Sequence, residues 1–154
     1  MNLGWALAAL LRAYQKQVET ALAGLPGGSR AFLVMSLVEQ ETCQSQVAIA
    51  ERLGVDRTTL TYLIDDLETE KLIKRTTDPA DRRNRHIGLT AKGTKTLAQL
   101  VQSVEQVERD VLSRLTKAEA EQFYASLVKS AGLEEGPSTD AESAHICRAA
   151  LPGN

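Results

Sequence analysis

The charged residues with the most specific spacing lie between positions 71 and 95. This segment holds eight lysines and arginines against two aspartates, although the whole chain has a formal net charge of -2 at pH 7. Asp81 and Arg83 are two residues apart, so in an extended strand their side chains share a face and the carboxylate can orient the guanidinium. A planar cation held in this way suits the narrow, electronegative minor groove of DNA.

Further cations surround this pair and could contact phosphates on both sides of such a groove. They are Lys74, Arg75, Arg82 and Arg85. Contacts of this kind would give salt-dependent affinity that does not depend on base sequence. The alternative is a solvated hairpin whose charges only prevent aggregation at a strand edge.

Few residues suit enzymatic or metal chemistry. The chain has two cysteines, Cys43 and Cys147, and two histidines, His86 and His145. Their separation favours neither a disulfide framework nor a metal cluster, and neither histidine is paired with a nucleophile. We therefore expect no catalytic activity, no metal and no cofactor. Few cysteines, and no pattern of a signal peptide or a membrane span, suggest a cytoplasmic protein.

The elements that must position the cations are mainly helical. The chain is rich in Ala, Leu, Glu, Gln and Lys and only 4% aromatic, and its 154 residues suffice for one domain. Apolar residues at three- and four-residue steps predict a helix over the first 23 residues. A second helix, at about 30–40, should follow a cap at Ser29.

The C-terminal part begins with a long helix of about 24 residues from Thr90, whose apolar stripe a small domain cannot bury by itself. Thr116 and Glu119 have the spacing of a capping box and should open a sixth helix. The tail at 134–154 is expected to be partly disordered or to form a short helix.

Between these helices, the sequence predicts a helix-turn-helix followed by a β-hairpin. Ser45 can cap the helix QVAIAERL, which should end at Gly54, and Asp56 can cap the next helix. The apolar stripe of that next helix consists of Leu60, Leu63, Ile64 and Leu67. Residues 73–76 and 86–89 flank a polar tip and predict the two strands of a wing.

The segment DPADRRNRHIGLTAKG, residues 78–93, resembles the wing of the MarR-type winged-helix regulators. QVAIAERLGVDRTTLTYLIDDLE and the helix order on both sides extend the resemblance over about 3–132. It implies a mainly α fold with a small β-hairpin wing. The winged helix-turn-helix, about 29–95, would be flanked by N- and C-terminal dimerisation helices, about 3–23 and 90–132, in one regulator domain over 1–133.

By this resemblance the protein would be a homodimeric repressor of transcription that binds double-stranded DNA at a pseudo-palindromic operator. The helix that starts at Arg57 would enter the major groove. Its candidate contacts are Arg57, Thr58, Thr59, Thr61 and Tyr62. Arg83 would probe the minor groove, and Asp81 would orient it.

Three residues depart from the family pattern, which often has basic residues at the positions of Tyr62 and Asp66 and a glycine at that of Lys71. The acidic second half of this helix should repel phosphate unless its carboxylates face the protein or are paired internally. A left-handed Lys71 would cost about 1 kcal/mol or more, which leaves open whether the helix instead runs on into the strand.

Many such regulators release DNA when a small, often aromatic, anion enters a cleft beside the dimer helices. Trp5 and Tyr14, with Arg12 or Arg30, could line such a cleft, or the aromatic residues could simply belong to the core. Peroxide-sensing members carry their thiol in the first helix, so we expect no redox role for Cys43. An alternative function is a winged-helix module that binds a basic protein through its acidic helix and does not read DNA.

Overall fold

The computed structural model describes residues 2–40, 45–77 and 85–132. The predictions for Asp81, Arg82, Arg83, Cys43 and the tail lie outside the described residues. Within them, the chain forms six helices and one two-stranded antiparallel sheet, which confirms the predicted fold class. The elements are α1 (Leu3–Ala21), α2 (Gly28–Glu39), α3 (Gln46–Leu53), α4 (Arg57–Thr69), β1 (Ile73–Thr77), β2 (Arg85–Leu89), α5 (Ala91–Val111) and α6 (Lys117–Ser130).

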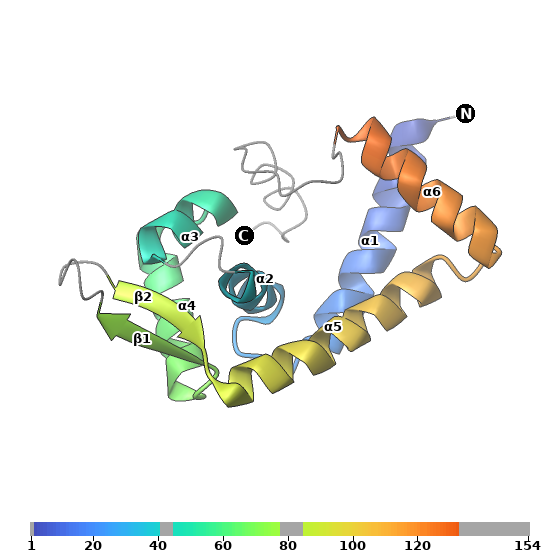
Figure 1. The fold of residues 1–154 in the computed structure, drawn as a ribbon. Helices are drawn as coiled ribbons and strands as arrows, with labels where there is room; N and C mark the ends of the chain where they lie inside the picture. Colours follow the sequence, from blue (N-terminus) through green and yellow to red (C-terminus); the bar gives the residue numbers. More distant parts are fainter. Residues whose placement is uncertain (1, 41–44, 78–84, 133–154) are drawn as a thin grey trace.

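The long helix α5 connects two groups of elements (Figure 1). At its start, α2, α3, α4 and the hairpin gather into one lobe, while α1 lies along α5 and α6 follows at the far end. Among the described helices, none is both long and apolar enough to cross a membrane.

Two apolar clusters hold these elements together. The larger cluster joins α2, α3, α4, the hairpin and the start of α5, and the predicted stripe of α4 lies inside it. The smaller cluster packs α1 on α5 through Val18, Leu22, Val104 and Val107. Helix α6 contains no buried residue. Its side chains Tyr124 and Leu127 are exposed, and Phe123 and Val128 are half-buried.

Local capping defines the helix-turn-helix where the sequence predicted it. Oγ of Ser45 accepts a hydrogen bond from the N–H of Ala48 at 3.1 Å, which begins α3. The Asp56 carboxylate accepts one from the N–H of Thr59 at 2.9 Å, which begins α4. Gly54 closes α3 with φ 62, a left-handed conformation that costs glycine least. The predicted helix pair is thereby confirmed.

The predicted start of α2 is wrong. Ser29 does not cap this helix, because α2 already begins at Gly28 and Gly27 precedes it with φ 82 and no side-chain cap. A Cβ built on Gly27 would lie 2.1 Å from Cδ1 of Leu63. The backbone of Gly27 therefore approaches α4 closely, and the chain turns into α2 two residues earlier than the Ser29 cap required.

The C-terminal helices differ from the prediction only in length. Helix α5 has 21 residues rather than about 24, because the chain turns after it and the N–H of Leu115 donates to the carbonyl of Leu112 at 2.9 Å. The predicted capping box is complete: Thr116 and Glu119 each accept a hydrogen bond from the other's backbone N–H at the start of α6.

Helix α4 ends at Thr69 and does not run on into β1. Lys71 has φ 59, so it adopts the left-handed conformation that the sequence left in question. The N–H of Lys71 donates to the carbonyl of Glu68, and that of Leu72 to the carbonyl of Leu67, both at 2.9 Å. This is the Schellman arrangement, and the buried Leu67 and Leu72 supply its usual hydrophobic contact. The chain thus keeps a glycine-type turn without a glycine.

The turn into α5 packs against the same corner. The N–H of Thr90 donates to the carbonyl of Leu72 at 3.0 Å, and Oγ1 of Thr90 accepts from the N–H of Gly93 at 2.9 Å. A Cβ on Gly93 would lie 1.9 Å from the carbonyl oxygen of Leu72. The threonine and glycine of the LTAKG segment are therefore required where the hairpin, α4 and α5 meet.

Candidate nucleic-acid interface

The base of the wing is a continuous antiparallel ladder. Its register runs from Ile73 opposite Leu89 to Thr77 opposite Arg85, so each strand is one residue longer than predicted. An isolated bridge pairs Ser45 with His86 and attaches the hairpin to the residue that caps α3. The wing is therefore fixed to the helix-turn-helix at its base.

Alternation along β1 separates two cations that the sequence analysis treated alike. Ile73 is buried and Lys74 is exposed, while Arg75 shares the face of Ile73 and has a side chain only 14% exposed. Lys74 therefore points to solvent, and Arg75 points toward α4. The burial of Ile73 in a period-two pattern was the signal that could have separated them.

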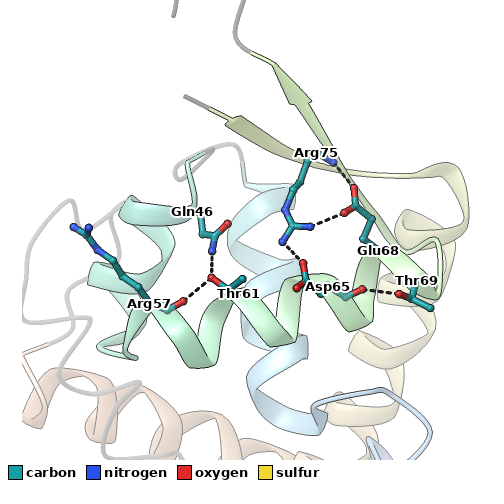
Figure 2. A network of polar contacts seen from close by, with 7 residues as sticks. All are labelled: Gln46, Arg57, Thr61, Asp65, Glu68, Thr69 and Arg75. Carbon is teal, nitrogen blue, oxygen red and sulfur yellow. Dashed lines mark hydrogen bonds and ion pairs between the residues drawn. The ribbon is translucent and has the colours of Figure 1, made fainter. Parts of the chain in front are cut away.

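The first two turns of α4 present three of the predicted contact residues to solvent. Arg57 and Thr58 are exposed, and Tyr62 is 68% exposed. In Figure 2 the side chain of Arg57 extends away from the polar network on the same helix. These three residues form a surface that another molecule can reach.

The other two predicted contacts on α4 use their hydroxyls within the protein. Oγ1 of Thr61 accepts from Nε2 of Gln46 at 2.6 Å and donates to the carbonyl of Arg57 at 2.7 Å, which ties α4 to α3. Oγ1 of Thr59 donates to the Asp56 carboxylate at 2.5 Å. Hydrogen bonds from the side chain and then the backbone of Thr59 lower the pKa of Asp56. The Thr61 hydroxyl thus connects α4 to α3, and the Thr59 hydroxyl supports the residue that caps α4.

Four carboxylates lie on the second half of α4 and at its C-cap, and two of them are paired with the wing. Nη2 of Arg75 lies 2.5 Å from Oδ1 of Asp65, and Nη1 lies 2.6 Å from Oε2 of Glu68 (Figure 2). Although burial by itself lowers the pKa of Arg75, the hydrogen bonds with Asp65 and Glu68 raise it above its ordinary value. The guanidinium is therefore charged at any physiological pH.

The remaining two carboxylates, Asp66 on α4 and Glu70 at its C-cap, are exposed. Nζ of Lys92 donates to the carbonyl of Glu70 at 2.7 Å and lies 4.0 Å from its carboxylate, so a cation of α5 covers the C-terminus of α4. Asp66 remains exposed on a face that also carries Tyr62, four residues earlier.

The predicted ligand residues do not converge on one site. An apolar groove of about 470 Å³ lies between α1, α5 and α6, and the lining residues with a polar side-chain group are Tyr14, Glu108 and Tyr124. Trp5, Arg12 and Arg30 do not line this groove; Trp5 is 74% exposed near the start of α1. Burial and then the Glu108 carboxylate raise the pKa of Tyr14.

Burial also raises the pKa of Glu108, and the neighbouring Glu105 adds to this effect. The groove thus combines an apolar wall with a carboxyl group that is costly to ionise. Within the described residues, no group of three or more histidine, cysteine, aspartate or glutamate side chains could hold a metal ion.

Comparison with known proteins identifies the family. A sequence profile described as the MarR family matches residues 29–84. The transcriptional regulator HosA of Escherichia coli O111:H- is 34% identical over 92 residues, which cover 60% of this chain and 68% of HosA. The chain belongs to the MarR family. It is therefore a transcriptional regulator, a class of protein distinct from enzymes.

Solved structures of MarR-family proteins share the fold. A mutant of MarR from Escherichia coli superposes with a TM-score of 0.74 at 24% identity, covering 84% of this chain and 96% of MarR. A structure of that MarR mutant complexed with operator DNA gives a TM-score of 0.66 at 23% identity and covers 83% of this chain and 92% of MarR. These likenesses confirm the winged-helix architecture of this MarR-family chain.

Proposed function

We propose that this MarR-family regulator is a homodimeric repressor that binds a pseudo-palindromic DNA operator through α4 and the wing. The observation that carries the proposal is the exposed face formed by Arg57, Thr58 and Tyr62 beside a hairpin that presents Lys74. A helix at this place in a helix-turn-helix enters the major groove, and dimers read half-sites about one helical turn apart.

The proposed DNA contacts are of two kinds, those made by α4 and those made by the wing. Arg57, Thr58 and Tyr62 contact base edges or nearby phosphates, while Lys74 contacts phosphate. At the wing tip, outside the described residues, Arg83 enters the minor groove with Asp81 orienting it, and Arg82 contacts phosphate. Arg85, at the start of β2, is proposed to contact phosphate as well. Thr59 and Thr61 act by shaping the helix pair, because their hydroxyls are already engaged.

The dimer forms through the helices outside the winged-helix lobe, at about 3–23 and 90–132, and the lobe itself spans about 29–95. Support comes from the apolar side chains that α1 and α6 leave exposed. They include Leu3, Trp5, Leu7, Leu11, Tyr124 and Leu127. A surface of this kind on two neighbouring helices is typical of a protein interface.

A small aromatic or anionic ligand releases the dimer from DNA by changing the spacing of the two lobes. In this proposal Tyr14, Trp5, Arg12 and Arg30 are the candidate ligand residues, and Tyr14 is the one that lines the groove between α1, α5 and α6. The protein acts in the cytoplasm and needs no cofactor.

A mobility-shift titration on the DNA upstream of the gene tests the proposal. Binding should saturate with a dimer and weaken steeply with salt, because phosphate contacts release counterions. Equal affinity for a shuffled sequence of the same composition would overturn operator recognition. An elution volume of a monomer at micromolar concentration would overturn the dimer.

The protein-interaction alternative makes the opposite prediction. A module that binds a basic partner through Asp66 and Glu70 would bind no DNA at low salt, and the Arg57→Ala variant would retain partner binding. If the wild type binds DNA and Arg57→Ala does not, the repressor proposal is supported instead.

A further inference from the structure

We propose that Arg75 is a positioning residue for DNA binding: it holds the wing on the recognition helix α4 and covers two carboxylates that would otherwise repel phosphate. This inference rests on the proposed function, since it concerns the DNA-binding face. It gives Arg75 a different role from Lys74, its neighbour in sequence.

The geometry ties one guanidinium to two turns of α4. Arg75 reaches Asp65 and Glu68 through separate nitrogen atoms, and its backbone N–H donates to Oε1 of Glu68 at 3.1 Å. Glu68 therefore binds the backbone and the side chain of the same wing residue. The backbone carbonyl of Asp65 also accepts a hydrogen bond from Oγ1 of Thr69 at 2.9 Å, within the same helix.

Arg75 is poorly placed to contact phosphate itself. Its side chain is 14% exposed, whereas the Asp65 and Glu68 side chains are 51% and 40% exposed. The carboxylates thus lie nearer to solvent than the cation that neutralises them. A phosphate approaching this part of α4 would meet the acidic residues first.

Removal of the guanidinium would uncover a concentration of negative charge. Asp65 and Glu68 would join the exposed Asp66 and Glu70, at the end of the helix where the backbone dipole is already negative. One uncovered charge within about 8 Å of a phosphate weakens binding roughly twofold in water. Over several phosphates and two half-sites, affinity should fall about tenfold.

The same interactions connect wing position with charge. Because Arg75 belongs to β1 and its partners to α4, moving the hairpin away from the helix separates the ion pairs. The carboxylates are covered only while the wing is docked. The wing is therefore docked on α4 in the same state in which the negative charge near the recognition helix is neutralised.

The test compares four proteins for operator affinity over a salt series: wild type, Arg75→Ala, the double variant Asp65→Asn with Glu68→Gln, and the triple variant. We expect Arg75→Ala to bind about tenfold more weakly at low salt, and this loss should shrink as salt is raised, because salt screens the repulsion between the carboxylates and phosphate. The operator affinity of the triple variant should lie within about threefold of the wild-type affinity, because the side chains at positions 65 and 68 are then neutral. Circular dichroism and thermal unfolding confirm that each variant is folded.

Lys74→Ala is the matched control, because Lys74 is the exposed neighbour proposed to contact phosphate. Its salt slope should fall by roughly 0.9 for each phosphate that the lysine neutralises. The same fall in Arg75→Ala, without recovery in the triple variant, would show that Arg75 itself binds phosphate and would overturn the inference. Unchanged affinity of Arg75→Ala would also overturn it, whereas failure of the wild type to bind DNA would overturn the proposed function itself.

Discussion

Replacing Lys71 with glycine should stabilise the protein. Lys71 has φ 59, and a left-handed conformation costs an L-residue about 1–2 kcal/mol. Glycine removes this strain but loses roughly 0.4–1 kcal/mol more conformational entropy on folding. The backbone hydrogen bonds of the turn do not involve the side chain, and that side chain is exposed. The net gain in the free energy of unfolding should be about 0.5–1 kcal/mol.

Urea and thermal unfolding at one fixed protein concentration measure this gain, because the stability of a dimer depends on concentration. A gain of this size should raise Tm by roughly 1–4 °C. Lys71→Ala is the control, since it removes the side chain and keeps the strained Cβ, and it should unfold close to wild type. A Lys71→Gly variant no more stable than Lys71→Ala would refute the idea that the turn is strained.

Three further substitutions test other parts of the structure. Gly93→Ala should lower the free energy of unfolding by about 3 kcal/mol, because the added Cβ would lie 1.9 Å from the carbonyl oxygen of Leu72. Chemical denaturation measures this change. A decrease under 1 kcal/mol would show that the backbone around Leu72 can move to accommodate the Cβ. Asp66→Lys should tighten operator binding roughly tenfold at low salt, because a carboxylate that repels phosphate is replaced by an ammonium group that attracts it. Weaker binding in a mobility shift would show instead that Asp66 has a structural partner. Glu108→Gln should raise Tm at pH 7. Because the folded state raises the pKa of Glu108, it binds the proton more tightly than the unfolded state, and stability falls as pH rises above the ordinary value of 4.5. The variant should show less of this fall, and an identical pH dependence of Tm would contradict the assignment.

The sequence by itself determined the local elements of this protein. Ser45, Asp56 and Thr116 each cap a helix within three residues along the chain, and such interactions depend on spacing alone. The apolar stripe of α4 and the two wing strands likewise follow from periods of 3.6 and 2. For this reason the order of elements and the helix-turn-helix could be predicted, whereas the family was inferred from the resemblance of residues 78–93 to the wing of MarR-type regulators. The start of α2 could not, because Gly27 is set by contact with Leu63, far along the chain.

Only the tertiary structure decided what the polar side chains of the site do. Lys74 and Arg75 are adjacent and equally basic, yet α4 supplies partners to one of them alone. Thr61 belongs to the predicted contact face, yet Gln46, fifteen residues away, engages its hydroxyl. The left-handed Lys71 persists because the core holds Leu67 and Leu72 on either side of the turn. Each outcome depends on which distant residue packs nearby, and neither composition nor periodicity contains that information.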